Sequence, residues 1–180
     1  MSDESKSTLS ALLKDKPRRG RPKHAVSRQN VYVELSDEQK SLMRELAKKL
    51  PKPVRRADIP DLATALLSAR LEQLRRSVEG RNREMPEGIV ELISLYLLWD
   101  LPVPRDVSGA KWTSIRLSPQ QVVQLGRVHG VLNALFGASR SQVFSLGIAL
   151  LEAALENELA TLTKIATVQE MKERIIKVYL

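Results

Sequence analysis

Apolar and polar residues alternate with a period of two in two short segments, residues 30–36 and 112–118. Such alternation predicts a β-strand that buries one face and exposes the other. The expected buried positions are Val31, Val33, Leu35, Thr113, Ile115 and Leu117. Because a single strand exposes too much apolar surface to be stable, we expect the two segments to pair.

A helical pattern with a recognisable start follows each predicted strand. Ser36 and Gln39 have the spacing of a capping box, in which two side chains satisfy the first backbone amides of a helix. Ser118 and Gln121 repeat that spacing, and Pro119 suits the first helical position. The apolar stripes of these helices are Leu42, Met43, Leu46 and Leu50 in one, and Leu125, Val128 and Leu132 in the other.

A second helix is predicted in each half. Pro51 and Pro53 end the preceding helix in the first half, and the next begins at about Asp58. Gly137 ends the corresponding helix in the second half, and Ser139 opens the next. The inward positions are Ile59, Leu62, Leu66, Leu67 and Leu71, and then Val143, Leu146, Leu150 and Leu151. The chain thus contains strand, helix and helix twice.

This repeat, with Leu-Ser at the end of each strand, resembles the ribbon-helix-helix (Arc/MetJ-like) family of bacterial DNA-binding proteins. The resemblance covers residues 30–76 and 112–159. It implies a mainly α fold with a short two-stranded antiparallel β-ribbon, a tandem ribbon-helix-helix pseudo-dimer in one chain. The first copy departs from the family, because it has Arg-Arg-Ala at residues 55–57 where the second has Ser-Arg-Ser at residues 139–141.

In that family the ribbon lies in the major groove and its outward side chains contact bases. The resemblance implies this role for Asn30, Tyr32, Glu34, Trp112, Ser114 and Arg116. Arg116 can pair with guanine, Asn30 with adenine, and Glu34 can accept a hydrogen bond from cytosine. Trp112 and Glu34 are unusual there, and the alternatives are that Trp112 covers the core edge and Glu34 repels phosphate. Because the strands differ, a non-palindromic site becomes possible.

The family also binds the flanking phosphates at the N-terminus of each second helix, where free amides and the helix dipole favour anions. The resemblance implies this role for Arg55, Arg56, Ser139, Arg140 and Ser141. An ordinary surface helix cap is the alternative at both places.

The chain has a formal net charge of +8, and residues 1–30 hold eight basic against three acidic residues. Part of that segment resembles an AT-hook, whose core is Arg-Gly-Arg-Pro. The matching residues are Arg18, Arg19, Gly20, Arg21, Pro22 and Lys23. Arginines are attracted to the narrow minor groove of A·T-rich DNA, and Gly and Pro allow a close, extended approach. A solvated basic linker is the alternative.

These patterns divide the chain into five segments. Residues 1–29 form a basic arm, residues 30–80 and 112–159 the two copies, residues 81–111 a linker, and residues 160–180 a last helix.

Two apolar segments outside the copies can fill the core or join protomers. One is a predicted helix at residues 86–100, which is too short for a membrane span. The other is the last helix, in which Met171, Ile175 and Val178 recur at near-heptad spacing. If a homo-oligomer forms, we expect it to use residues 86–100 or 165–180.

Composition excludes several classes of function. The absence of cysteine removes disulfides, cysteine nucleophiles and iron–sulfur clusters, and the two histidines, His24 and His129, nearly exclude a histidine metal site. No glycine-rich phosphate loop, GxSxG or HExxH motif occurs. We therefore expect no enzymatic activity, cofactor or metal, and a cytoplasmic, nucleoid-associated prokaryotic protein with no membrane segment.

Together the patterns predict a sequence-specific protein that binds double-stranded DNA, most simply a transcriptional repressor. Two alternatives stay open. One is a DNA-architectural, relaxosome or recombination accessory factor of a mobile element. The other is an antitoxin-like protein-interaction module that holds its partner through residues 86–100.

Overall fold

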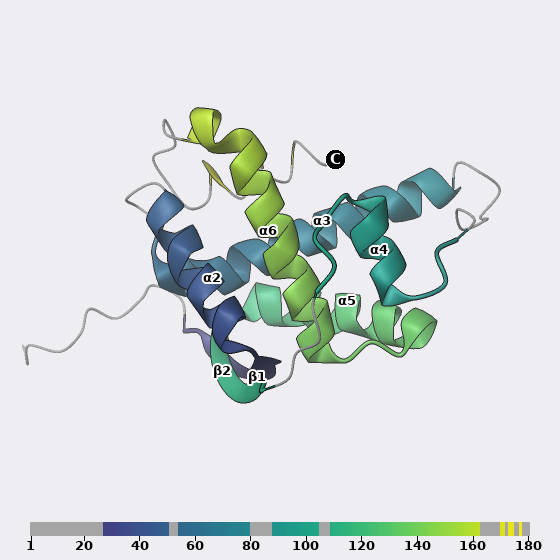
Figure 1. Cartoon of the computed structure of the whole chain (residues 1–180), viewed down its shortest axis with the longest axis horizontal. Coiled ribbons are helices and arrows are strands. Elements are labelled where there is room, and N and C mark those ends of the chain that lie inside the picture. The colour runs from purple at the N-terminus through teal and green to yellow at the C-terminus, as the bar shows by residue number, and fades with distance from the viewer. Residues whose placement is uncertain are drawn as a thin grey trace, which may run out of the picture.

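The computed structural model of the chain is mainly helical, with a two-stranded antiparallel sheet at one edge (Figure 1). It describes residues 27–50, 54–79, 88–104, 109–162, 170, 171, 173, 174 and 177. The elements are β1 (Gln29–Leu35), α2 (Asp37–Lys49), a 3₁₀ turn (Arg56–Asp58), α3 (Ile59–Glu79), α4 (Leu92–Leu98), β2 (Lys111–Leu117), α5 (Pro119–Phe136) and α6 (Arg140–Leu162). The predicted class, mainly α with a short two-stranded antiparallel ribbon, is confirmed.

The pairing of β1 with β2 follows the internal repeat. The repeat equates Tyr32 with Ser114, and these two residues face one another at the centre of the sheet. The pairs on either side exchange places when the two copies are interchanged. The ribbon therefore has an approximate twofold axis that passes between Tyr32 and Ser114.

The second helices of the two copies, α3 and α6, cross at equivalent residues. The repeat equates Ala63 with Gly147, and both are buried. A Cβ atom on Gly147 would lie 3.0 Å from the carbonyl oxygen of Ala63, so the missing side chain lets the two backbones approach. The copies also interlock, because α2 packs on α6, α5 packs on α3, and each strand packs on the second helix of the other copy.

A shared hydrophobic core joins the two copies. Four of the six inward strand positions are buried, namely Val33, Leu35, Ile115 and Leu117. The other two, nearer the strand ends, are only partly buried. Every residue of α3 from Ile59 to Leu67 is buried beneath them. Each copy thus closes its core with helices of the other.

The first helices of the two copies begin differently. Ser36 Oγ accepts the Gln39 amide at 3.1 Å and Gln39 Oε1 accepts the Ser36 amide at 3.0 Å, which confirms the predicted capping box. Pro119 occupies the first turn of α5 as predicted, but the predicted box at Ser118 is wrong. The Ser118 amide donates to Asp61 Oδ1 at 2.9 Å, so it needs no capping partner within its own helix, and Gln121 is buried.

The junction between α5 and α6 matches the prediction. Gly137 ends α5 with a φ of 66°, a left-handed conformation that glycine adopts without strain. Ser139 Oγ then accepts the Gln142 amide at 3.2 Å, and Gln142 Oε1 accepts the Ser139 amide at 2.8 Å. This reciprocal pair fixes the start of α6.

Within residues 88–100, the described part of the apolar segment at residues 86–100, only α4 is helical, so the predicted helix is too long. Gly88 has a φ of 90°, outside the helical range. At the other end Asp100 has a φ of 52°, and the Leu101 amide donates to the Tyr96 carbonyl at 2.8 Å. These features form a Schellman motif, which ends the helix.

The predicted apolar stripe of the last helix, residues 160–180, is described at one position, Met171. Met171 is fully buried and belongs to the shared core, so this side chain packs on its own chain. Ile175 and Val178 lie outside the described residues.

Among the described residues, no single helix is long and apolar enough to cross a membrane. Within the same part of the chain, only α5 together with residues Arg140–Glu156 of α6 is long and apolar enough, and the chain bends by 110° between these two helices.

The close crossing of α3 and α6 at Gly147 predicts how substitutions there affect stability. Gly147→Ala places a Cβ against the Ala63 backbone at the crossing, so we expect it to lower the free energy of unfolding by about 1–3 kcal/mol. The matched control is Gly130→Ala in α5, where no atom lies within 4 Å of the added Cβ. Helix propensity alone should make that control more stable by about 0.5–1 kcal/mol. Urea unfolding measures both, and a stabilised Gly147→Ala variant would contradict the crossing.

Candidate nucleic-acid interface

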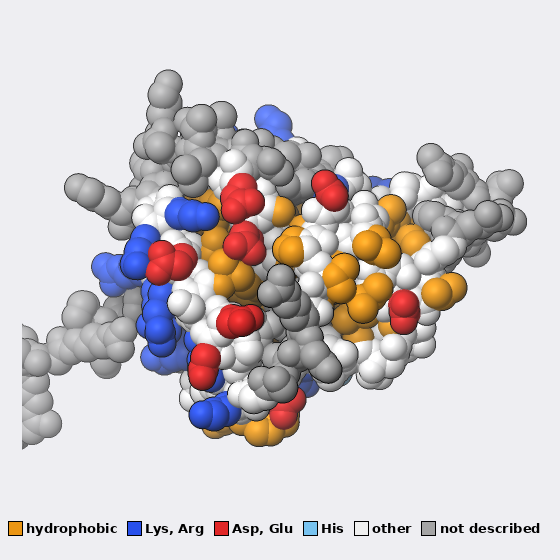
Figure 2. All heavy atoms as spheres, in the orientation of Figure 1, with side chains coloured by type: hydrophobic (Ala, Val, Ile, Leu, Met, Phe, Trp, Pro, Cys, Tyr) orange, Lys and Arg blue, Asp and Glu red, His pale blue; other side chains and the backbone are white. Residues whose placement is uncertain are grey.

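The outer face of the ribbon carries all six predicted base-contacting residues. Alternate residues of a strand point to one face, and the antiparallel register brings both sets to the same side. All six are exposed: Asn30, Tyr32, Glu34, Trp112, Ser114 and Arg116. Hydrophobic side chains are visible at this edge of the molecule (Figure 2). Trp112 is 69% exposed, so its ring does not cover the core edge.

The face consists of three cross-strand pairs. Tyr32 and Ser114 form the central pair on the approximate axis. In the antiparallel register, Asn30 lies opposite Arg116 at one end of the ribbon, and Glu34 lies opposite Trp112 at the other end. One end therefore combines an amide with a guanidinium, and the other a carboxylate with an indole.

The start of α6 is tied to the ribbon. The backbone amide of Glu34 donates to Ser141 Oγ at 2.8 Å, which fixes the N-terminus of α6 beside β1. Ser139 caps the helix and Arg140 is exposed. The predicted phosphate-binding residues of the second copy thus lie next to the ribbon, and Ser141 has a structural role there as well.

The start of α3 is built around an arginine that the sequence analysis did not identify. Arg28, just before β1, donates hydrogen bonds to the Ala57 carbonyl and to the Asp58 carboxylate. Its guanidinium also lies 3.5 Å from Asp61 Oδ2. The three charged side chains are largely buried. Nothing in the local pattern around Arg28 predicts partners about thirty positions away.

Arg55 and Arg56 precede α3 and are exposed, as a phosphate-binding role requires. The amide of Arg55 donates to Asp58 Oδ2 at 2.8 Å. A carboxylate therefore caps this helix start, whereas the neutral Gln142 occupies the equivalent place in α6.

A further polar contact joins the two copies beneath the ribbon. Gln39 Nε2 donates to Ser145 Oγ at 2.7 Å, from α2 of the first copy to α6 of the second. The repeat equates Gln39 with Gln121 and Ser145 with Asp61, and Asp61 holds the Ser118 amide. A side-chain hydrogen bond between two neutral residues thus joins α2 to α6, whereas a carboxylate of α3 binds the backbone at the start of α5.

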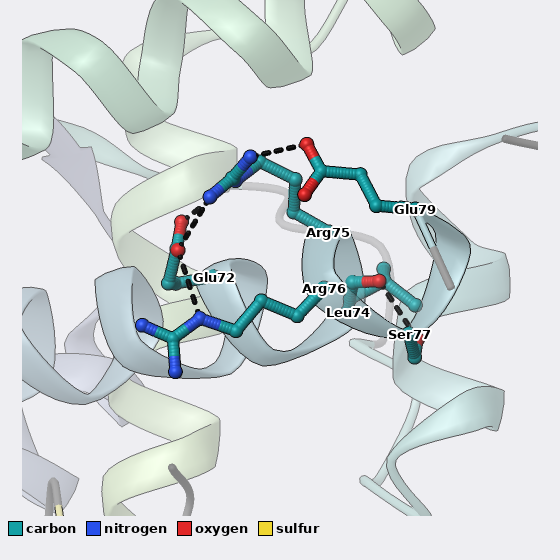
Figure 3. A network of polar contacts seen from close by, with 6 residues as sticks. All are labelled: Glu72, Leu74, Arg75, Arg76, Ser77 and Glu79. Carbon is teal, nitrogen blue, oxygen red and sulfur yellow. Dashed lines mark hydrogen bonds and ion pairs between the residues drawn. The ribbon is translucent and has the colours of Figure 1, made fainter.

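Other arginines are paired in the second half of α3 (Figure 3). Arg75 bonds both Glu72, at 2.7 Å, and Glu79, and Arg76 bonds Glu72 at 3.1 Å. The hydrogen bond from Arg75 helps to lower the pKa of Glu72 to about 2. These arginines are neutralised by neighbours on their own helix, and they lie several turns from the end of α3 that adjoins the ribbon.

A separate apolar surface lies around α4. Figure 2 shows hydrophobic side chains gathered over the end of the molecule where Figure 1 places α4. Val90 and Leu97 are among the most exposed apolar residues. A cavity of about 850 Å³ lies nearby between α3 and α5, with Leu95 of α4 at its wall.

The AT-hook-like motif at residues 18–23 lies outside the described residues. Within the described ranges, no three His, Cys, Asp or Glu side chains are grouped as metal ligands would be. Comparison with protein-family models, with curated proteins and with solved structures gives no significant match.

Arg28 makes the second prediction. Arg28→Ala leaves the carboxylates of Asp58 and Asp61 without their cation in a mostly buried place, so the free energy of unfolding should fall by about 1–3 kcal/mol. The control is Lys48→Ala, which breaks the exposed pair with Glu45 and should cost under about 1 kcal/mol. Equal losses in urea unfolding would contradict a structural role for Arg28.

Proposed function

We propose that the chain is a sequence-specific protein that binds double-stranded DNA, with the β1–β2 ribbon inserted in the major groove. The observation that carries the proposal is the outer face of the ribbon, where side chains with donors and acceptors stand exposed on a narrow, two-stranded support. The major groove admits a two-stranded ribbon, and it presents a distinct pattern of donors and acceptors for each base pair.

The surroundings of the ribbon support the same function. The starts of α3 and α6 flank it, each with an exposed arginine. Helix N-termini favour anions, and phosphates lie along both edges of the groove. In this proposal Arg55, Arg56 and Arg140 bind phosphate, while Ser139 contributes through its position at the start of α6.

The basic arm adds affinity in the proposal. Arg21 and Arg19 lie eight and ten residues before β1 in the sequence, so in this proposal the arm binds DNA next to the ribbon. Its arginines bind the minor groove of A·T-rich flanking DNA. Contacts between lysine or arginine and phosphate make the affinity fall steeply with salt.

Transcriptional repression is the role we favour, and footprinting across the host genome separates it from the others. Protection of a short promoter segment supports a repressor, whereas protection at a transfer or recombination origin supports an accessory factor. An antitoxin-like role is the second candidate, because the exposed apolar residues around α4 form a surface apart from the ribbon. Absence of protection at low salt would reject both DNA-binding roles.

Arg116 tests the base-reading role. Arg116→Ala removes a bidentate donor, so affinity for the bound sequence should fall by about 1–3 kcal/mol, with relaxed preference at particular base pairs. Affinities for a panel of single-base variants of the site measure this change.

The matched control is Arg76→Ala, which removes the same charge far along α3, where Arg76 pairs with Glu72. It should leave base preference unchanged. Uniform weakening of all sequences by Arg116→Ala would make Arg116 a phosphate contact and contradict its proposed role.

The arm is tested separately. The double substitution of Arg19 and Arg21 by Ala should weaken binding more at sites with A·T flanks than at sites with G·C flanks, because the minor-groove potential depends on sequence. Fluorescence anisotropy at constant salt compares the two sites. An equal loss at both would reduce the arm to a non-specific cation.

A further inference from the structure

The two ends of the ribbon correspond to one another in the internal repeat, but their exposed outer faces carry opposite charges, at Arg116 and Glu34. The repeat equates Arg116 with Glu34, and the approximate axis therefore exchanges a guanidinium with a carboxylate on the exposed face. The repeat also equates Asn30 with Trp112. We call the end with Asn30 and Arg116 the arginine end, and the end with Glu34 and Trp112 the glutamate end.

Further positive charge gathers at the arginine end. Arg28 adjoins Gln29, which pairs with Leu117 at that end of the ribbon, and it binds the start of α3. The exposed Arg55 and Arg56 therefore belong to the arginine end. Because Arg28 neutralises part of the buried acidic charge beneath them, these two arginines are left to attract phosphate.

Exposed acidic side chains gather at the glutamate end, beside the exposed cations Lys111 and Arg140. β1 stops there and leads into α2, whose first turn carries the exposed Asp37 and Glu38. Their counterparts at the other end, in the first turn of α5, are the uncharged Pro119 and Gln120.

A cleft of about 640 Å³ at the glutamate end is lined by Glu34 and Glu91 together with Ser139 and Ser141. Two carboxylates thus stand beside the N-terminus of α6. They oppose the attraction of that helix start for phosphate, because like charges repel across a shared cleft.

The basic arm is attached to the arginine end alone. Ser27 and Arg28, at the end of the arm, are the first described residues of the chain, and the contacts of Arg28 with Ala57 and Asp58 fix where the arm joins the fold. Because the arm joins the fold there, we expect it to bind the DNA flank on that side.

Building on the proposed DNA-binding function, we propose that the chain binds non-palindromic duplex DNA in one orientation. The base contacts concentrate in the half-site under the arginine end, and an A·T-rich minor groove flanks that half-site only. The opposite charges of Arg116 and Glu34 decide the orientation, because turning the protein around would place a carboxylate where the bases and phosphates favour a cation.

The absence of natural cysteine allows a direct test. Gln29→Cys and Lys111→Cys occupy equivalent, exposed positions at the arginine and glutamate ends, respectively. An iron chelate that cleaves nearby DNA is attached to the new cysteine of each full-length variant. Each labelled variant is then bound to a DNA site obtained by selection from random duplexes.

Each variant should cut on one side of the site only, and the two variants should cut on opposite sides, with Gln29→Cys on the A·T-rich side. Cleavage of both flanks by each variant would overturn the single orientation. Failure of the unlabelled chain to protect any sequence would instead reject the proposed function, so the two failures are distinguishable.

Glu34→Arg gives a second readout, because it makes the two ends alike at that position. We expect this variant to bind a palindrome built from two arginine-end half-sites about tenfold more tightly than the unaltered chain does. The control is Glu45→Arg, an exposed glutamate of α2 away from the ribbon face, which adds the same charge. An equal gain from both variants would overturn the role of Glu34 in orientation.

Discussion

The antiparallel pairing of β1 with β2 is the interaction on which the rest of the structure depends. The strands are seven residues long and have no other partner in the described part of the chain. Their pairing brings together segments that the sequence separates widely, and it determines which helix covers which strand. α6 packs on β1 and α3 packs on β2, so the strand register and the helix crossing express one approximate twofold relation. A shift of one residue would turn the apolar face of the ribbon outward.

The two copies share this geometry but differ in the side chains that connect them. Gln39 meets Ser145 at one junction, whereas a carboxylate of α3 holds the Ser118 amide at the other. Arg28 balances that carboxylate and its neighbour Asp58. The buried carboxylates of Asp58 and Asp61 therefore require the guanidinium of Arg28, and the same contact fixes where the basic arm joins the fold. Stability and the direction of the proposed DNA contacts are coupled through one side chain.

Much of this architecture could be predicted from the chain because its signals are local. Alternation located both strands, and capping chemistry located the start of α2 and the position of Pro119. The errors arose where a partner comes from a distant segment. Asp61 took the role expected of Gln121, and Arg28 gave no local sign of its ion pairs. The helix at residues 86–100 was predicted too long, because apolar content does not reveal the positive φ angles of Gly88 and Asp100 on either side of α4.

The central claim is that one chain reads duplex DNA with a ribbon that is twofold in shape and asymmetric in charge. The most direct test is selection of bound DNA from a random duplex library at physiological salt, followed by sequencing. The account predicts a single enriched motif that is not palindromic, with an A·T-rich tract on one flank. Recovery of DNA with no enriched motif, while the chain remains folded, would contradict it.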